Sequence, residues 1–282
     1  MSLNRHKLLG FAALNKSYFS LFASPLLALF TSLLVGVSAM WEILFFGTFF
    51  LLATAFLNSY NNIMDVKSDA ITKKNFPIPA GIITPKEALR YSTFLCALSM
   101  VVALLIAFVN VVAGLILFLD LLFAFFYSAP RIRLKRFPAV KGSILVSHTL
   151  LIPFTAAAVL TGRNPLSSIA AVPPLFLMGL SIHTVQDIGD VKGDRLIGDK
   201  TIPLIFGTRK AVVLALALLF IAVTYVAFLE VQLKTAAISS LLAQATMLAF
   251  LLFKEGLWKH VFWGCSAISF LTLATLLYRC CS

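Results

Sequence analysis

Charged side chains are scarce in this sequence, and acidic ones are the scarcest. Asp and Glu together number 11 among 282 residues, charged residues of all kinds make up 12%, and 60% of the residues are hydrophobic. Soluble globular domains carry about 25% charged residues, so this composition excludes a water-soluble fold. With a mean hydropathy of +0.98, the chain has the composition of an integral membrane protein.

Cysteine is sparse too, which argues against two further kinds of site. The four cysteines are Cys96, Cys265, Cys280 and Cys281. Their spacing matches no metal site, and three of them lie in or beside apolar runs, where a thiol behaves as a small hydrophobic group. We therefore expect neither disulfides nor zinc. A cleavable signal peptide is not indicated either, because the first apolar run is too long and no small-residue cleavage pattern follows it.

Long apolar runs, by contrast, are abundant. A helix needs about 20 predominantly apolar residues to cross the hydrocarbon core of a bilayer. Nine windows meet this requirement, near 17–38, 41–63, 89–108, 111–129, 142–162, 167–186, 210–229, 235–253 and 258–278. The third and fourth windows are divided only by a weak break around Asn110 and Gly114. These runs predict an all-α integral membrane protein that forms one domain over residues 1–282.

Basic residues indicate the orientation of the spans, because Lys and Arg gather in short cytoplasmic loops. With the N-terminus inside, 20 of the 23 basic residues fall on one face, and only Arg163, Lys234 and Arg279 fall on the other. We therefore expect a cytoplasmic N-terminus and a C-terminus outside. The basic face is expected to attract anionic membrane lipid or a multiply charged phosphate substrate. Its loops are short and poor in aromatic residues, so no nucleic-acid partner is expected.

The few acidic residues recur in one phrase. The sequence DVKSD at 65–69 returns as DVKGD at 190–194, 125 positions later. Each phrase opens a long polar loop on the basic face and is followed by a basic segment and then by proline and glycine. This pattern indicates a quasi-repeat over about 17–129 and 142–278, although the hydrophobic helices themselves show no similarity.

The spacing of these acids suits metal binding. Two sets of side chains recur at intervals of four residues: Asn61, Asp65 and Asp69, and then Gln186, Asp190 and Asp194, with Asp187 in addition. On a helix this spacing stacks the side chains on one face. Mg²⁺ prefers such carboxylates together with waters and phosphate oxygens. Alternatively, they are solvated acids paired with nearby Lys and Arg; their repetition at matched positions favours the metal site.

Two acidic segments beside a basic loop suit a diphosphate group, because metal ions bridge the phosphate oxygens while Lys and Arg neutralise the remaining charge. In a membrane enzyme, the substrate would be a lipid diphosphate whose tail lies among the helices. Loss of diphosphate from an allylic prenyl chain leaves a resonance-stabilised cation. Such an enzyme must therefore hold the leaving group and exclude water.

With these residues in place, the chain resembles the UbiA-type intramembrane prenyltransferases. NNIMDVKSD is similar to that family's first Asp-rich motif, DIGDVKGD to its second, and YSAPRIRLKR to its segment between the fourth and fifth helices. FPIPAG and KTIPLIFG are similar to the segments that follow each motif. The resemblance covers almost the whole chain. It implies nine transmembrane helices in a ring around a lipid-open cavity, with both motifs at the cytoplasmic mouth.

The resemblance also implies a set of metal ligands. The residues expected to bind Mg²⁺, and through it to hold the diphosphate for catalysis, are Asp65, Asp69, Asp190 and Asp194. Asn61 and Asp187 are expected to be additional ligands, or residues that hold the ligands and the diphosphate in place.

Four further residues are candidates for contact with the substrate. Lys74, Lys135 and Arg136 are expected to contact the diphosphate, although a charge that only sets membrane topology explains each of them as well. By the resemblance, Tyr127 lies near the reacting allylic carbon, where its ring or phenol oxygen would stabilise a cation. The alternative for Tyr127 is an ordinary buried tyrosine with a hydrogen bond.

Some residues depart from the family pattern or have no role in it. Position 62 is Asn where the family usually has an acid, and Phe76 stands where many members have Arg. Asp120 lies deep in the fourth apolar run, where a carboxylate costs about 3 kcal/mol and needs the cavity or a partner. His148 and His183 also fall in predicted helices, and we expect packing residues there rather than catalytic bases.

Together these features predict Mg²⁺-dependent transfer of a prenyl group, geranyl to geranylgeranyl or longer, from its diphosphate to a lipophilic acceptor. The acceptor is an aromatic ring such as a quinone precursor, a tetrapyrrole, or an archaeal glycerophosphate lipid. No obligate protein partner is indicated. The alternative is a secondary transporter or ion channel, which would place its acids near the bilayer midplane. The matched acids instead follow membrane spans, and only Asp120 is deep.

Overall fold

Helices form every regular element of the computed structural model, which describes residues 5–15, 18–72, 74–163, 170, 172–229 and 234–277. The long helices are α2 (Tyr18–Val35), α3 (Met40–Met64), α5 (Pro85–Val109), α6 (Val111–Ser128), α9 (Val172–Ile197), α11 (Thr208–Phe228), α12 (Lys234–Ala249) and α13 (Trp258–Leu277). The shorter ones are α1 (Arg5–Ala13), α4 (Val66–Thr72), α7 (Pro138–Val146), α8 (Ile152–Leu160) and α10 (Ile202–Phe206). Short 3-10 or π-helical turns are η1 (Leu134–Arg136), η2 (Ser147–Leu151), η4 (Phe250–Leu252) and η5 (Glu255–Leu257).

The helices coincide with the predicted spans. A helix lies at each predicted window, and for the fifth window α7, η2 and α8 follow one another without a gap. Within the described residues, six helical stretches are long and apolar enough to cross a membrane: Met40–Met64, Pro85–Val109, Val111–Ser128, Val140–Leu160, Thr208–Phe228 and Lys234–Leu252. The prediction of an all-α, multi-pass integral membrane protein is therefore confirmed. The count of nine spans and the ring around a lipid-open cavity stay predictions.

The weak break between the third and fourth windows is a tight connection between α5 and α6. The backbone amide of Asn110 donates to the carbonyl of Ile106 at the end of α5. The side-chain oxygen of Asn110 accepts a 3.0 Å hydrogen bond from the amide of Ala113 at the start of α6. A Cβ on Gly114 would lie 2.4 Å from the Cβ of Ala107. Glycine therefore allows the two helices to approach each other closely directly after the turn.

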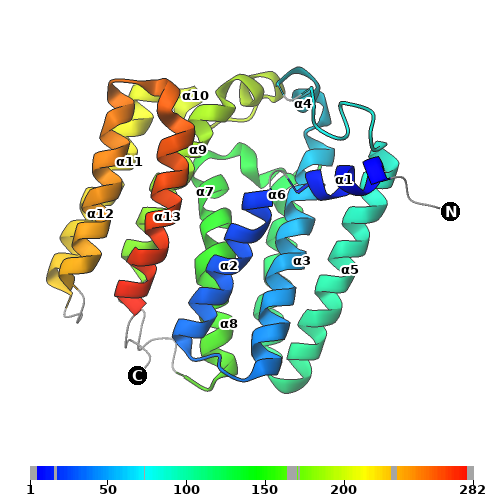
Figure 1. Ribbon diagram of the computed structural model, residues 1–282, viewed down its shortest axis with the longest axis horizontal. Helices are drawn as coiled ribbons and strands as arrows, with labels where there is room; N and C mark the ends of the chain where they lie inside the picture. The colour runs from blue at the N-terminus through cyan, green and yellow to red at the C-terminus, as the bar shows by residue number, and fades with distance from the viewer. Residues whose placement is uncertain are drawn as a thin grey trace.

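The long helices lie side by side, and the acid-rich phrases meet at one end of them. Figure 1 shows α4 and α10 at this end, drawn at the top. α3 packs against α2, α5 and α6, while α9 packs against α11 and α13, and α4 reaches across to contact α9. The first phrase spans the junction of α3 and α4, and the second lies in the last turns of α9. The fold thus brings two segments 125 residues apart in sequence to one place.

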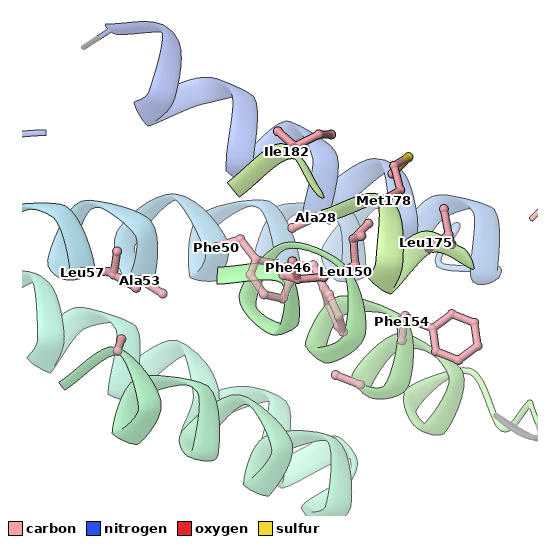
Figure 2. Close-up of a cluster of buried hydrophobic side chains, with 14 of the residues drawn as sticks. Ala28, Phe46, Phe50, Ala53, Leu57, Leu150, Phe154, Leu175, Met178 and Ile182 are labelled. Atoms are coloured by element: carbon pink, nitrogen blue, oxygen red, sulfur yellow. The ribbon is translucent and has the colours of Figure 1, made fainter. Parts of the chain in front are cut away.

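Apolar side chains fill the space between these helices. In Figure 2, Phe46 and Phe50 of α3 lie beside Leu150 and Phe154, with Met178 of α9 nearby. Outward-facing residues are apolar as well, and large phenylalanines on several helices are mostly exposed, among them Phe108, Phe220 and Phe228. An apolar exterior around an apolar core suits contact with lipid chains instead of water.

Candidate metal and diphosphate site

The first acid-rich phrase sits at the junction between α3 and α4. Asp65 ends α3, and its backbone amide donates to the carbonyl of Asn61 at 2.9 Å, while the amide of Asp69 donates to the carbonyl of Asp65 at 2.9 Å. The helical hydrogen bonding therefore continues through the junction, and the four-residue spacing is kept. Asn61 and Asp69 are buried, and Asp65 is partly exposed.

The second phrase lies on one continuous helix and touches the first. α9 carries Asp187, Asp190 and Asp194 on successive turns before it ends at Ile197. Ser68 of α4 donates a 3.3 Å hydrogen bond from its hydroxyl to the carbonyl of Gly193 in α9. Contact between the two motifs is therefore direct.

Asp65 is surrounded by cations from the segment between α6 and α7. Arg133 donates to a carboxylate oxygen of Asp65 at 2.9 Å, and the amine of Lys135 pairs with the other oxygen. Lys135 also donates to the side-chain oxygen of Asn61 at 2.5 Å, and the hydroxyl of Ser128 donates to the same oxygen at 2.9 Å. This network joins the end of α3 to the end of α6.

Arg133 links both motif-bearing helices. Besides Asp65, its guanidinium donates two hydrogen bonds to Asp199, at 2.8 and 3.1 Å. Burial lowers the pKa of Arg133, but the hydrogen bonds that Arg133 donates to Asp199 and the negative charge of Asp65 outweigh that effect and raise the pKa. The backbone of Arg133 is left-handed, with φ of 41°. Arg133 therefore remains a fixed positive charge between the two acid-rich segments.

Lys141 of α7 provides a third cation, this time at the second motif. Its amine lies 2.6 Å from a carboxylate oxygen of Asp187 and 3.7 Å from Oδ2 of Asp194, and its side chain is only 12% exposed. Burial raises the pKa of Asp187, although the charge of Lys141 opposes this shift. Burial also raises the pKa of Asp194, to about 6.

Tyr127 lies next to this charged cluster, at the last turn of α6. It is buried, and the amine of Lys135 is 5.9 Å from the centre of its ring. Its neighbour Ser128 belongs to the Asn61 network. The structure thus places the Tyr127 ring beside the charged cluster, and its expected position near an allylic carbon stays a prediction.

Two of the expected diphosphate contacts lie further out. Lys74 is exposed in the loop after α4, and Arg136 is exposed, with its guanidinium 4.8 Å from the ring centre of Phe137. The described part of the chain records no ion pair between either residue and a motif carboxylate. Of the three basic residues singled out in the sequence, only Lys135 is in the carboxylate cluster.

Sequence reasoning missed Arg133, Lys141 and Asp199. Arg133 lies in the same basic segment as Lys135, and spacing alone does not say which base turns inward. Lys141 stands one residue before an apolar window, which is the one feature in the sequence that marks it as unusual. A charged residue at the edge of a span needs a partner at that depth.

The departure at position 62 has a structural counterpart. Asn62 donates from its side-chain amide to the carbonyl of Leu14, which ties α3 to the segment after α1. Asn62, Asp69 and Phe76 line one small pocket together with Pro77. The usual acid of the family is thus replaced by a residue that binds the N-terminal segment.

The donor set fits a magnesium ion that is shared with a substrate. Among the described residues, no three His, Cys, Asp or Glu side chains are close enough to hold a metal by themselves. Mg²⁺ does not need such a cage, since it is commonly bound by one or two carboxylates, waters and substrate phosphates. Oδ2 of Asp194 is buried and accepts no hydrogen bond, and the amine of Lys141 lies 3.7 Å from it. A buried carboxylate oxygen whose one recorded cation is this distant is suited to a metal ion as a closer partner.

The fold and the site define a polytopic helical membrane protein in which two acid-rich segments and three inward-facing cations meet at one end of the helices. The chain belongs to the UbiA prenyltransferase family, whose model matches residues 18–260. The resemblance stated from the motifs is therefore confirmed.

Several curated relatives of the chain are archaeal synthases. The chain is 33% identical over 175 residues to the digeranylgeranylglyceryl phosphate synthase of Thermococcus gammatolerans. The matched region covers 62% of this chain and 60% of that protein. The synthase of the same name from Methanosphaera stadtmanae is 31% identical over 185 residues, covering 66% of this chain and 65% of that protein. The matched region thus spans less than two thirds of these relatives.

Solved structures support the fold over nearly the full length. A UbiA homolog from Archaeoglobus fulgidus bound to GPP and Mg²⁺ superimposes with a TM-score of 0.72 at 19% identity, covering 96% of this chain and 99% of that chain. A structure of digeranylgeranylglyceryl phosphate synthase in membranes gives a TM-score of 0.66 at 21% identity, covering 98% and 99%. At these identities the likeness concerns the fold.

Proposed function

We propose that this protein transfers a prenyl group from a prenyl diphosphate to a lipophilic acceptor and releases diphosphate, with Mg²⁺ as cofactor. The observation that carries the proposal is the meeting of the two acid-rich motifs, joined through Ser68 and Gly193, around the buried Lys135 and the largely buried Lys141. Carboxylates that bind metal, together with cations that bind phosphate, are the groups a diphosphate leaving group requires.

The metal would be held by residues of both motifs. The proposed ligands are Asp65, Asp69, Asp190 and Asp194, with Asn61 and Asp187 as further ligands or holders. Bound Mg²⁺ would neutralise negative charge on the diphosphate and so make it a better leaving group.

Cations of the chain would bind the remaining phosphate oxygens. Arg133, Lys135 and Lys141 are turned into the cluster, and each has N–H groups that donate charge-assisted hydrogen bonds. Lys74 and Arg136, which are exposed at the same end, would attract the anionic head of the substrate before it reaches the cluster. The bases that face the cluster therefore act on the bound diphosphate, and the exposed ones act on its capture.

Tyr127 would face the allylic carbon as the diphosphate departs. The face of its ring attracts positive charge, and this attraction is strongest where water is excluded. Since Tyr127 is buried beside Lys135, it is suited both to stabilise a developing cation and to keep water from it. The acceptor would then attack the cation and lose a proton.

The names of the relatives favour one acceptor class. Their product, digeranylgeranylglyceryl phosphate, carries two geranylgeranyl groups on a glyceryl phosphate. We therefore propose geranylgeranyl diphosphate as the donor and the hydroxyl of a glyceryl phosphate lipid as the acceptor. Aromatic rings and tetrapyrroles, the other acceptors that the motifs allow, become comparison substrates.

We also propose that the site faces the cytoplasm, with the N-terminus on the same side and the C-terminus outside, because 20 of the 23 basic residues then lie on the cytoplasmic face. Residues 1–282 would form one domain built from the quasi-repeat of about 17–129 and 142–278.

The test is diphosphate release by the protein purified into lipid. Geranyl, farnesyl and geranylgeranyl diphosphates would each be supplied with and without Mg²⁺, alone and with glyceryl phosphate lipid, quinone-precursor or tetrapyrrole acceptors. We expect metal-dependent release that is coupled to the glyceryl phosphate lipid. Folded protein that neither releases diphosphate nor binds Mg²⁺ and diphosphate would refute the enzyme proposal in favour of transport, while coupling to another acceptor would refute only the choice of acceptor.

A further inference from the structure

Three polar side chains form a continuous hydrogen-bonded chain deep among the apolar helices. The Nδ1 of His148 lies 2.8 and 3.1 Å from the two carboxylate oxygens of Asp120, and its Nε2 lies 2.9 Å from the hydroxyl of Thr54. All three residues are buried, with at most 4% of their surface exposed. Carboxylate oxygens are hydrogen-bond acceptors, which gives Nδ1 the donor role toward Asp120 and leaves the other ring nitrogen for Thr54.

The three hydrogen-bonded side chains come from three separate helical segments. Thr54 belongs to α3, Asp120 to α6, and His148 to η2, the π-helical turn between α7 and α8. A π-helical turn is rare and is often found at functional sites. Here it precedes Pro153, which has no amide hydrogen for the regular helical ladder, and it places His148 against the edge of the Phe50 ring, at 6.1 Å between ring centres.

Each of these residues is seven positions from a residue of the candidate site on the same stretch of helix. Thr54 precedes Asn61, Asp120 precedes Tyr127, and His148 follows Lys141. Seven residues make nearly two helical turns, so the paired side chains share a face and lie about 10 Å apart along the axis. The polar chain is therefore a second layer beneath the site, built from the same three helical stretches.

Hydrogen bonds in such a layer do something that apolar packing does not. They depend on distance and angle, so they hold one rotation and one axial position of each helix. Apolar side chains alone tolerate small sliding of one helix against another. Burying a carboxylate in place of an apolar residue is costly in a membrane, so its hydrogen bonds must be kept. Fixing the registry between helices is the best-attested role of buried polar groups.

We propose that Thr54, His148 and Asp120 are positioning residues that set the register of the three helical stretches presenting Asn61, Tyr127 and Lys141 to the substrate. They do not touch the diphosphate themselves. The inference rests on the proposed prenyl transfer, because these hydrogen bonds are proposed to control the geometry of the prenyl-transfer site. A displacement of about 1 Å at a reacting centre costs up to 100-fold in rate.

A matched pair of substitutions at Thr54 separates this role from simple packing. Thr54→Ser keeps the hydroxyl and loses a methyl group from the core, whereas Thr54→Val keeps the shape and loses the hydroxyl. We expect Thr54→Val to lower kcat by about 10- to 100-fold with little change in the KM for the prenyl diphosphate. We expect Thr54→Ser to keep a kcat near that of the unmodified protein, even where its thermal stability falls further.

The control is Thr31→Val. Thr31 is also buried, and its hydroxyl donates only to the carbonyl of Leu27 within its own helix. Its substitution is expected to leave kcat unchanged. Loss of activity in Thr54→Ser equal to that in Thr54→Val, or an equal loss in Thr31→Val, would show that packing alone matters and overturn the inference. Full activity in Thr54→Val would also overturn it, while an inactive unmodified protein would instead refute the proposed function.

Discussion

Ser68 donates its hydroxyl to the carbonyl of Gly193 at 3.3 Å, and the two residues occupy the same position of the repeated phrase, 125 residues apart. This is the one position at which DVKSD and DVKGD differ. The repetition in sequence thus becomes a contact between α4 and α9. Ser68 supplies the donor of this contact, and the acceptor is the backbone carbonyl of Gly193.

The first prediction concerns this contact. Ser68→Ala removes the hydrogen bond between the motifs, which is worth about 1 kcal/mol. We expect a several-fold rise in the apparent KM for the prenyl diphosphate, because both motifs must close on the same diphosphate. Steady-state kinetics in lipid would measure it. Ser99→Ala, which removes a buried hydroxyl bonded only to its own helix, is the control, and an unchanged KM in Ser68→Ala would contradict the prediction.

The second prediction concerns Lys141, whose amine lies 2.6 Å from Asp187. Removing one partner of a buried ion pair costs about 3–5 kcal/mol, because the other charge is left uncompensated. We expect Lys141→Met to be strongly destabilised against SDS or heat and inactive. In the double variant Lys141→Met with Asp187→Asn, most of the stability should return, because the isolated charge is gone, while activity stays lost.

Lys254→Met serves as the control for that series. Lys254 is exposed, and its substitution removes one positive charge from the same predicted face. It should change neither stability nor turnover by a measurable amount. Recovery of activity together with stability in the double variant would show that Lys141 only balances Asp187 and does not bind the diphosphate.

The third prediction separates two neighbouring bases. Lys135 is buried and bonded to Asn61 and Asp65, whereas Arg136 is exposed. We expect Lys135→Ala to lower kcat/KM by about 100-fold, since an electrostatic donor to the leaving group is lost. Arg136→Ala should raise KM a few-fold at low salt and have no effect at high salt, because long-range attraction is screened. Equal effects of the two substitutions would contradict this division.

The fourth prediction tests the metal ligands. Asp69→Ala and Asp194→Ala should each lower turnover by about 1,000-fold and weaken Mn²⁺ binding, which can be followed by electron paramagnetic resonance. The membrane fold should persist, because Asp69 in α4 and Asp194 near the end of α9 both lie outside the predicted spans. Glu87→Gln is a suitable control, since Glu87 pairs with Lys7 away from the motifs. Full turnover in either Asp variant would refute the metal-site assignment.

Helix positions were predictable because the apolar runs have the length of a membrane span. The window 41–63 corresponds to Met40–Met64, and 111–129 to Val111–Ser128. α9 is an exception, because it continues to Ile197, well past the predicted end at 186. Polar residues there keep a helical backbone outside the membrane, and hydropathy does not detect this.

Contacts between distant residues were not predictable. The sequence indicated that Asp120 needs a partner, and His148 is that partner, but nothing in spacing joins residues 28 positions apart on different helices. Both ring nitrogens of His148 have hydrogen-bond partners, and its expected role as a core residue instead of a catalytic base stays a prediction. Arg133 has a left-handed backbone conformation and points into the cluster. The basic segment in the sequence does not predict this conformation.

The last prediction concerns Tyr127, the buried ring beside Lys135. If the face of the ring stabilises an allylic cation, Tyr127→Phe keeps that face while Tyr127→Leu removes it. A desolvated cation–π contact contributes about 2 kcal/mol, which corresponds to about 30-fold in rate. We therefore expect Tyr127→Leu to lower the single-turnover rate by about 30-fold and Tyr127→Phe to change it only slightly. A loss in Tyr127→Phe as large as that in Tyr127→Leu would assign the effect to the phenol hydroxyl and contradict the ring-based role, because only the hydroxyl is missing from the phenylalanine variant.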